Sequence, residues 1–242
     1  MIDDTVILHV QDLKVWFPIQ KGILARTVGH VKAVDGVSFD LRRGETLGVV
    51  GESGSGKSTT ARVVAGLVKA TGGSFCLNGR LGMVFQDPLG SLNPRMTVRS
   101  ILAEATRETP PEELLKMVGL DASALDKYPH EFSGGQRQRI CIARAVALKP
   151  SLLICDEAVS ALDLSVRAQI LDLLSDLKAR LGLSILFITH DLGVVSHIAD
   201  RILVMQHGRI VEAGDCSQVI SNPKEEYTRS LLAAVPRIVC AK

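Results

Sequence analysis

One glycine-rich segment constrains the fold of this 242-residue chain more than any other feature, because of what stands on either side of it. Thr46 to Val50 is a short apolar run, and helical periodicity extends from Ala61 to Leu67. Between them lies Gly51-Glu52-Ser53-Gly54-Ser55-Gly56-Lys57-Ser58, which matches the phosphate-loop pattern G-x4-G-K-S in full. Strand, loop and helix in this order predict one half of a parallel βαβ unit.

The chemistry of this phosphate loop suits a nucleoside triphosphate. Glycines let backbone N–H groups converge on phosphate oxygens, and the following helix adds the positive end of its dipole. We expect the nucleotide to contact the run from Gly51 to Thr59, with Lys57 reaching the β- and γ-phosphates and the Ser58 hydroxyl ligating Mg²⁺. The loop alone leaves the class of protein open, since kinases, GTPases and motor proteins share it.

Apolar runs elsewhere in the chain indicate the fold class. Leu152 to Cys155 and Ser184 to Ile188 are typical of buried strands, and a helical pattern from Ser165 to Leu181 separates them. This alternation predicts an α/β sheet with helices on its faces. Near the N-terminus, the patterns of Ile7 to Val15 and Val31 to Leu41 predict an antiparallel sheet.

The middle of the chain has a different pattern. Residues 87–148 indicate helices interrupted at Pro110-Pro111 and Tyr128-Pro129, without a strand pattern. We therefore expect a P-loop core of the RecA-like kind, residues 1–86 and 149–242, which carries the antiparallel β-subdomain and into which this helical subdomain is inserted. Towards the end, apolar runs on both sides of His207-Gly208 predict a hairpin.

Composition argues against several classes of function. Basic residues number 28 and acidic residues 26, and this near balance gives no electrostatic footprint for nucleic acid. No stretch approaches the ~18 apolar residues that would span a bilayer, and the acidic start Met1-Ile2-Asp3-Asp4 lacks the form of a signal peptide. Any role at a membrane is therefore expected to depend on partner subunits.

A pair of acids, Asp156 and Glu157, follows the apolar run that ends at Cys155. At the carboxyl end of a parallel strand, a carboxylate faces the ligand crevice. Asp156 can then hold Mg²⁺, through water, and Glu157 can polarise an attacking water molecule as a general base. The alternative, two solvated acids at the start of a loop, is weakened by the phosphate loop upstream.

The segment Ser133-Gly134-Gly135-Gln136 precedes a helical pattern and forms a second candidate anion site. A hydroxyl and free N–H groups at a helix N-terminus can bind phosphate. One chain has little use for two such sites on one nucleotide, but two chains packed head to tail could each offer the site to the other's γ-phosphate. A plain capped helix start would explain Ser133 but not the pair of glycines.

With these motifs in this order, the sequence resembles an ATP-binding-cassette (ABC) nucleotide-binding domain over nearly its whole length. Ser133 to Gln136 matches the family signature, and Asp156-Glu157 matches its Walker B motif with the catalytic glutamate. The resemblance implies that ATP is bound with Mg²⁺ and hydrolysed by a pair of such chains, identical or related. It also implies that Lys57, Glu157 and His190 act in catalysis.

The resemblance assigns roles to further residues. Gln86 matches the Q-loop, which in the family meets Mg²⁺ and the attacking water and senses the membrane subunits. Asp163 matches the D-loop at the dimer seam, and His190 matches the switch histidine that contacts the γ-phosphate. Phe17 falls where the family stacks an aromatic ring on adenine, with Trp16 as its rival.

Within the family, the chain resembles ATPases of the oligopeptide, dipeptide and nickel import group. Gln86-Asp87-Pro88, Ser91 to Val98 and Tyr227 to Pro236 carry this resemblance, whereas the short connection from Asn78 to Phe85 departs from the group. The resemblance implies permease subunits in the membrane and an extracytoplasmic substrate-binding protein. It implies a position on the cytoplasmic face of the inner or plasma membrane.

Two other classes of function compete with this one. An ABC ATPase without a membrane partner would act on ribosomes or DNA, and such proteins usually carry two cassettes or a coiled-coil insertion. A cassette that binds nucleotide without hydrolysing it is the other class. The sequence argues against this second class, because it retains the residues expected to act in hydrolysis, namely Lys57, Asp156, Glu157 and His190.

Overall fold

The computed structural model describes residues 4–22 and 26–234, which fall into two compact units. Of the described residues, the first unit comprises 4–7, 41–45 and 77–186. The second unit comprises 8–22, 26–40, 46–76 and 187–234. Val235 and Pro236, at the end of the segment that resembles peptide-import ATPases, lie outside the described residues.

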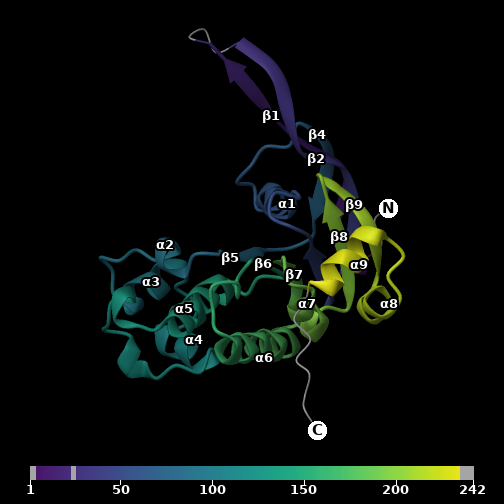
Figure 1. The fold of residues 1–242 in the computed structure, drawn as a ribbon. Coiled ribbons are helices and arrows are strands. Elements are labelled where there is room, and N and C mark those ends of the chain that lie inside the picture. Colours follow the sequence, from purple (N-terminus) through teal and green to yellow (C-terminus); the bar gives the residue numbers. More distant parts are fainter. Residues whose placement is uncertain (1–3, 23–25, 235–242) are drawn as a thin grey trace. The chain divides into compact units, whose positions relative to one another are not determined.

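The first unit is a group of helices beside parallel strands (Figure 1). Its elements are β5 (Leu81–Val84), α2 (Pro88–Ser91), α3 (Val98–Ala105), α4 (Pro111–Met117), η1 (Ala122–Ala124), η2 (Pro129–Glu131), α5 (Gly134–Val146), β6 (Leu152–Asp156), α6 (Leu164–Leu181) and the first half of β7 (Ser184–Thr189). Its strand order is β5-β6-β7, and β5 pairs in parallel with β6, Leu81 opposite Leu152. Every residue of β6 is buried, as expected for a strand covered on both faces.

The second unit contains the phosphate loop. Its elements are most of β1 (Val6–Lys21) and β2 (Arg26–Arg42), then β3 (Thr46–Val50), α1 (Lys57–Val64), most of β4 (Gly72–Leu77), the second half of β7, α7 (Leu192–Ile198), β8 (Arg201–Gln206), β9 (Arg209–Asp215), α8 (Cys216–Ser221) and α9 (Glu226–Ala233). The strand order β7-β3-β8-β9 places β3 centrally. Strand β3 is parallel to β8, and the turn at His207-Gly208 returns the chain antiparallel as β9.

A separate three-stranded sheet has the order β2-β1-β4. The Thr71 N–H donates to the Lys14 carbonyl over 2.8 Å, and the Asn78 N–H donates to the Ile7 carbonyl over the same distance. From the first of these bonds to the second, the residue number rises along β4 and falls along β1, so β4 is antiparallel to β1. Strands β1 and β2 run side by side as a long ribbon in Figure 1. This sheet is the N-terminal antiparallel sheet that the sequence predicts.

The fold class expected from the sequence is confirmed, namely an α/β P-loop fold with an antiparallel sheet. Within the described residues, no strand lies between β5 and β6, where the sequence predicts an inserted helical subdomain, although its boundaries stay a prediction. Strands β4 and β5 were not predicted. None of the helices in the described ranges is long and apolar enough to cross a membrane.

Close packing of α5 on β5 depends on Gly82, and this contact can be tested by substitution. A Cβ built on Gly82 would lie 2.5 Å from the Ala145 carbonyl oxygen and 3.1 Å from the Pro150 Cγ. We expect Gly82→Ala to lower the free energy of unfolding by about 1–3 kcal/mol, because helix and strand must separate. Urea denaturation followed by circular dichroism would measure it. Gly29→Ala is the control, since a Cβ there meets only the Ile19 Cδ1 at 3.7 Å. Equal stability of both variants would contradict the role of Gly82.

Candidate nucleotide-binding site

Lys57, at the start of α1, is folded back into the phosphate loop and is only 3% exposed. Its Nζ donates to the carbonyls of Gly51 and Glu52, each over 2.7 Å, and to the Ser55 Oγ over 3.3 Å. A buried ammonium group needs such partners because burial alone would disfavour its charge. The Lys57 ammonium group therefore lies inside the turn that the main chain of the loop makes around it.

The turn of the loop depends on two glycines at which there is no room for a side chain. A Cβ on Gly51 would lie 2.1 Å from the Met205 carbonyl oxygen, and one on Gly56 would lie 2.3 Å from the Ala33 carbonyl oxygen. Gly56 also has a φ of 105°, which favours glycine. Packing within this unit therefore requires glycine at both positions, apart from any requirement for close approach of a phosphate.

Two hydrogen bonds from outside the motif hold the loop in place. The Gly208 N–H, in the turn between β8 and β9, donates to the Ser55 carbonyl over 3.0 Å. The Glu52 N–H donates to the Tyr227 hydroxyl oxygen over 3.0 Å. Burial raises the pKa of the Tyr227 phenol, so this hydroxyl stays neutral. Neither residue was predicted as part of the site, because no pattern in the sequence links Gly208 or Tyr227 to the phosphate loop.

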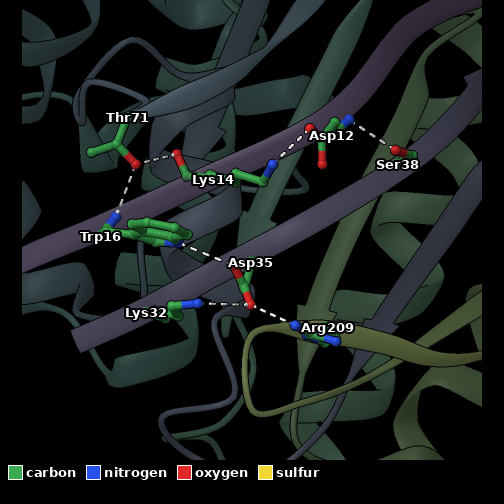
Figure 2. Close-up of polar contacts among 8 residues, drawn as sticks. All are labelled: Asp12, Lys14, Trp16, Lys32, Asp35, Ser38, Thr71 and Arg209. Atoms are coloured by element: carbon green, nitrogen blue, oxygen red, sulfur yellow. Dashed lines mark hydrogen bonds and ion pairs between the residues drawn. The ribbon is translucent and has the colours of Figure 1, made fainter. Parts of the chain in front are cut away.

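The second unit also carries the residues expected on adenine and on the γ-phosphate. Phe17, in the second half of β1, is 45% exposed. Trp16 is engaged inside the unit: its indole N–H donates to Asp35, and the Lys32 Nζ lies 4.3 Å from its ring centroid (Figure 2). Phe17 is therefore the more available of the two rings. His190 is exposed and directly follows β7.

In the first unit, the predicted acid pair stands at the end of β6. Asp156 is the last residue of this strand and is 2% exposed. Glu157 follows with a φ of 50°, a left-handed conformation that costs energy for a residue with a side chain. The Gln86 Nε2 donates to the Glu157 Oε2 over 3.3 Å. The structure thus brings together two residues that the sequence separates by 71 positions.

The signature segment forms the capped start of α5. The Gln136 N–H donates to the Ser133 Oγ over 3.3 Å, and the Ser133 N–H donates to the Gln136 Oε1 over 3.0 Å, which is a capping box. A Cβ on Gly135 would lie 2.4 Å from the Val166 Cγ1 of α6. Helix packing therefore gives at least one of the two glycines a structural role, which sequence reasoning did not supply.

Asp163 caps the next helix, α6. Its carboxylate accepts hydrogen bonds from the Val166 N–H over 3.0 Å and from the Ser165 hydroxyl over 2.8 Å. These bonds, the first above all, hold the pKa of Asp163 below its ordinary value. The predicted D-loop residue is thus fixed as a charged N-cap on an exposed surface.

The predicted residues divide between the units. The second unit holds Phe17, the phosphate loop and His190, and the first holds Gln86, Ser133 to Gln136, Asp156, Glu157 and Asp163. A phosphate loop between a buried parallel strand and a helix defines the class of P-loop nucleoside triphosphatases.

Comparison with known proteins gives the family. Residues 34–160 match the ABC transporter family. The peptidoglycan transport ATP-binding protein YejF of Agrobacterium fabrum is 48% identical over 95% of this chain, which spans 47% of that protein. The oligopeptide transport ATP-binding protein AppF of Bacillus subtilis is 48% identical over 95% of this chain and 78% of its own length. The chain belongs to the ABC transporter family.

A solved structure agrees with this assignment. It is a dimeric, post-hydrolysis state of the ATP-binding cassette MJ0796 bound to ADP and Pi. It matches with a TM-score of 0.74 and 25% identity over 86% of this chain and 98% of its own. As a member of the family, the chain is an ATP-binding cassette with the fold of an ATPase.

The tether from Tyr227 to the phosphate loop can be tested by removing one oxygen atom. Tyr227→Phe leaves the Glu52 N–H without this acceptor, so the loop loses preorganisation and ATP must order it on binding. We expect the Kd of ATP to rise about twofold to tenfold, the value of one ordinary hydrogen bond. Isothermal titration would measure it. The chain has two tyrosines, so Tyr128→Phe is the matched control. An unchanged Kd in Tyr227→Phe would contradict the tether.

Proposed function

We propose that this chain is the ATP-hydrolysing subunit of an importer for peptides or related small solutes, nickel included. The observation that carries the proposal is the 48% identity to the oligopeptide transport protein AppF over 95% of this chain. The relatives differ in what their names say they transport, since YejF is a peptidoglycan transport protein. The class of cargo is therefore proposed more broadly than one compound.

The chain is proposed to work as half of a dimer. The dimeric state of MJ0796 with ADP and Pi supports this proposal. A second cassette, identical or related, would offer its Ser133 to Gln136 segment to the γ-phosphate held by Lys57. Permease subunits would anchor the pair on the cytoplasmic face of the inner or plasma membrane, and an extracytoplasmic binding protein would deliver the cargo.

ATP binding would use the groups already present in the phosphate loop. The Lys57 ammonium would exchange its carbonyl partners for the β- and γ-phosphates, and the run from Gly51 to Thr59 would supply N–H groups. Phe17 would stack on adenine, because its ring is exposed while Trp16 is engaged with Asp35 and Lys32.

Mg²⁺ fits the chemistry of the residues proposed for it. Mg²⁺ prefers a few oxygen ligands, one or two of them carboxylates, together with substrate phosphates. Asp156 supplies a buried carboxylate at a strand end, and Ser58 and Gln86 would supply neutral oxygens. When bound, the ion would neutralise charge on the phosphoryl oxygens.

Hydrolysis would proceed by in-line attack of water on the γ-phosphorus, which breaks its bond to the bridging oxygen and releases ADP and inorganic phosphate. Glu157 would orient this water and accept its proton, and the hydrogen bond from Gln86 fixes one oxygen of the Glu157 carboxylate. His190 would contact the γ-phosphate. ATP must bind the closed dimer more tightly than the open one, since only differential affinity can move the permease subunits between conformations.

The role of Glu157 can be tested by neutralising it. Glu157→Gln keeps the size of the side chain but removes the base, so we expect phosphate release to fall by about 100-fold or more while ATP still binds. The variant should elute as a dimer in size-exclusion chromatography with ATP. Glu104→Gln, on the exposed part of α3, makes the same change of charge and should hydrolyse normally. Full turnover by Glu157→Gln would overturn the assigned base.

Lys57 can be tested separately from hydrolysis. Lys57→Ala removes a charge-assisted bond to phosphate, which is worth about tenfold to 100-fold in Kd. A titration with a fluorescent ATP analogue would measure the loss. Lys69→Ala removes the same charge from an exposed position after α1 and serves as the control. Unchanged affinity in Lys57→Ala would count against the phosphate loop as the nucleotide site.

A further inference from the structure

Asp35, on β2, sits at the centre of a polar cluster in the second unit (Figure 2). One carboxylate oxygen accepts the Trp16 indole N–H over 3.2 Å. The other accepts the Arg209 guanidinium over 2.7 Å and lies 3.6 Å from the Lys32 Nζ. The Asp35 side chain is 10% exposed, so these interactions are partly shielded from water. One carboxylate thus joins residues from β1, β2 and β9.

Asp35 also holds the turn that contacts the phosphate loop. Its N–H donates to the Gly208 carbonyl over 2.8 Å, while its carboxylate holds Arg209, the next residue. The Gly208 N–H in turn donates to the Ser55 carbonyl. A Cβ on Gly208 would lie 2.9 Å from the Lys32 carbonyl oxygen, so the turn packs directly on β2. A shift of this turn would therefore move Ser55.

The same carboxylate fixes the strand residue next to Phe17. Trp16 is held at its main-chain N–H by the Thr71 hydroxyl over 3.1 Å, at its indole by Asp35 and on its ring by Lys32. Successive residues of a strand point to opposite faces, so the orientation of Trp16 determines that of Phe17. Asp35 therefore influences the exposed ring as well as the phosphate loop.

Hydrogen bonds and charge hold this cluster beside a cavity. Asp35 and Arg209 border a cavity of about 410 Å³, so both have open space on one side. The Arg209 bond, with help from Lys32, lowers the pKa of Asp35, and the carboxylate is ionised at neutral pH. Replacing the carboxylate by an amide would remove the negative charge that Arg209 and Lys32 share and would turn one of the two acceptor oxygens into a donor, so Trp16 and Arg209 could no longer both be bonded.

We propose that Asp35 is a positioning residue for nucleotide binding. It fixes the orientation of Phe17 through Trp16 and the position of Ser55 through the Gly208-Arg209 turn. The inference rests on the proposed ATP site. It adds a residue outside every motif, on which the adenine side and the phosphate side of that site both depend.

Asp35→Asn is the test, because it removes the charge and keeps the shape. We expect the Kd of ATP to rise about tenfold, within the range for a lost charge-assisted hydrogen bond. Inorganic tripolyphosphate, which has no adenine, should also bind more weakly but by a smaller factor, since only the turn is then involved. Trp16 is the single tryptophan, so its fluorescence should change on ATP binding in the wild type and change less in the variant.

Two further variants make the result decisive. Asp40→Asn, on the same strand, makes the same charge change at a residue paired with His9 and should bind ATP like the wild type. Arg209→Gln breaks only the turn side of the cluster, so ATP and tripolyphosphate should weaken by the same factor. Circular dichroism would show that each variant is folded.

The outcomes separate this inference from the proposed function. If the wild type binds no ATP, the proposed function fails, and the inference falls with it. If the wild type binds ATP and Asp35→Asn binds it equally well, the inference alone is overturned. Equal weakening in Asp35→Asn and Asp40→Asn would also overturn it, because the effect would then be one of general charge.

Discussion

Main chain meets main chain without an intervening side chain at two points of the phosphate loop, and the shape of that loop depends on both contacts. Gly51 lies against the carbonyl of Met205 in β8, and Gly56 lies against the carbonyl of Ala33 in β2. The curvature of the loop is thus imposed by the strands beside it as well as by its own glycines. The same segment without these strands would match the motif but would lack the backbone contacts that fix its curvature.

Local signals explain which elements could be predicted from the sequence. Strands β3, β6 and β7 are buried at every residue, and such strands appear as uninterrupted apolar runs. Strand β4 is largely exposed and β5 has only 4 residues, so neither produces a recognisable alternation. The hairpin at His207-Gly208 was predicted correctly because its turn residues are themselves the signal.

Sequence patterns single out the motif residues of the candidate site, whereas they do not single out the residues that support those motifs. Tyr227 lies 175 positions from Glu52, and no periodicity links the two. The choice between Trp16 and Phe17 shows the same limit, because adjacent aromatic residues differ only in what surrounds them. Trp16 is engaged by one hydrogen bond to Asp35 and by contact with Lys32, and this could be recognised only once β1 and β2 were placed side by side.

Several groups proposed to act on the nucleotide already have partners within the chain. Lys57 donates to two loop carbonyls, and the N–H of Gln136 donates to Ser133. ATP binding would exchange these bonds instead of filling empty ones. Each group then contributes only a net difference, about 0.5–1.5 kcal/mol for a neutral hydrogen bond and about 1.5–3 kcal/mol for the charged Lys57. After hydrolysis, the internal partners are available to take these groups back. The internal bonds would therefore oppose tight retention of product, which fits the proposed cycle of closing and reopening.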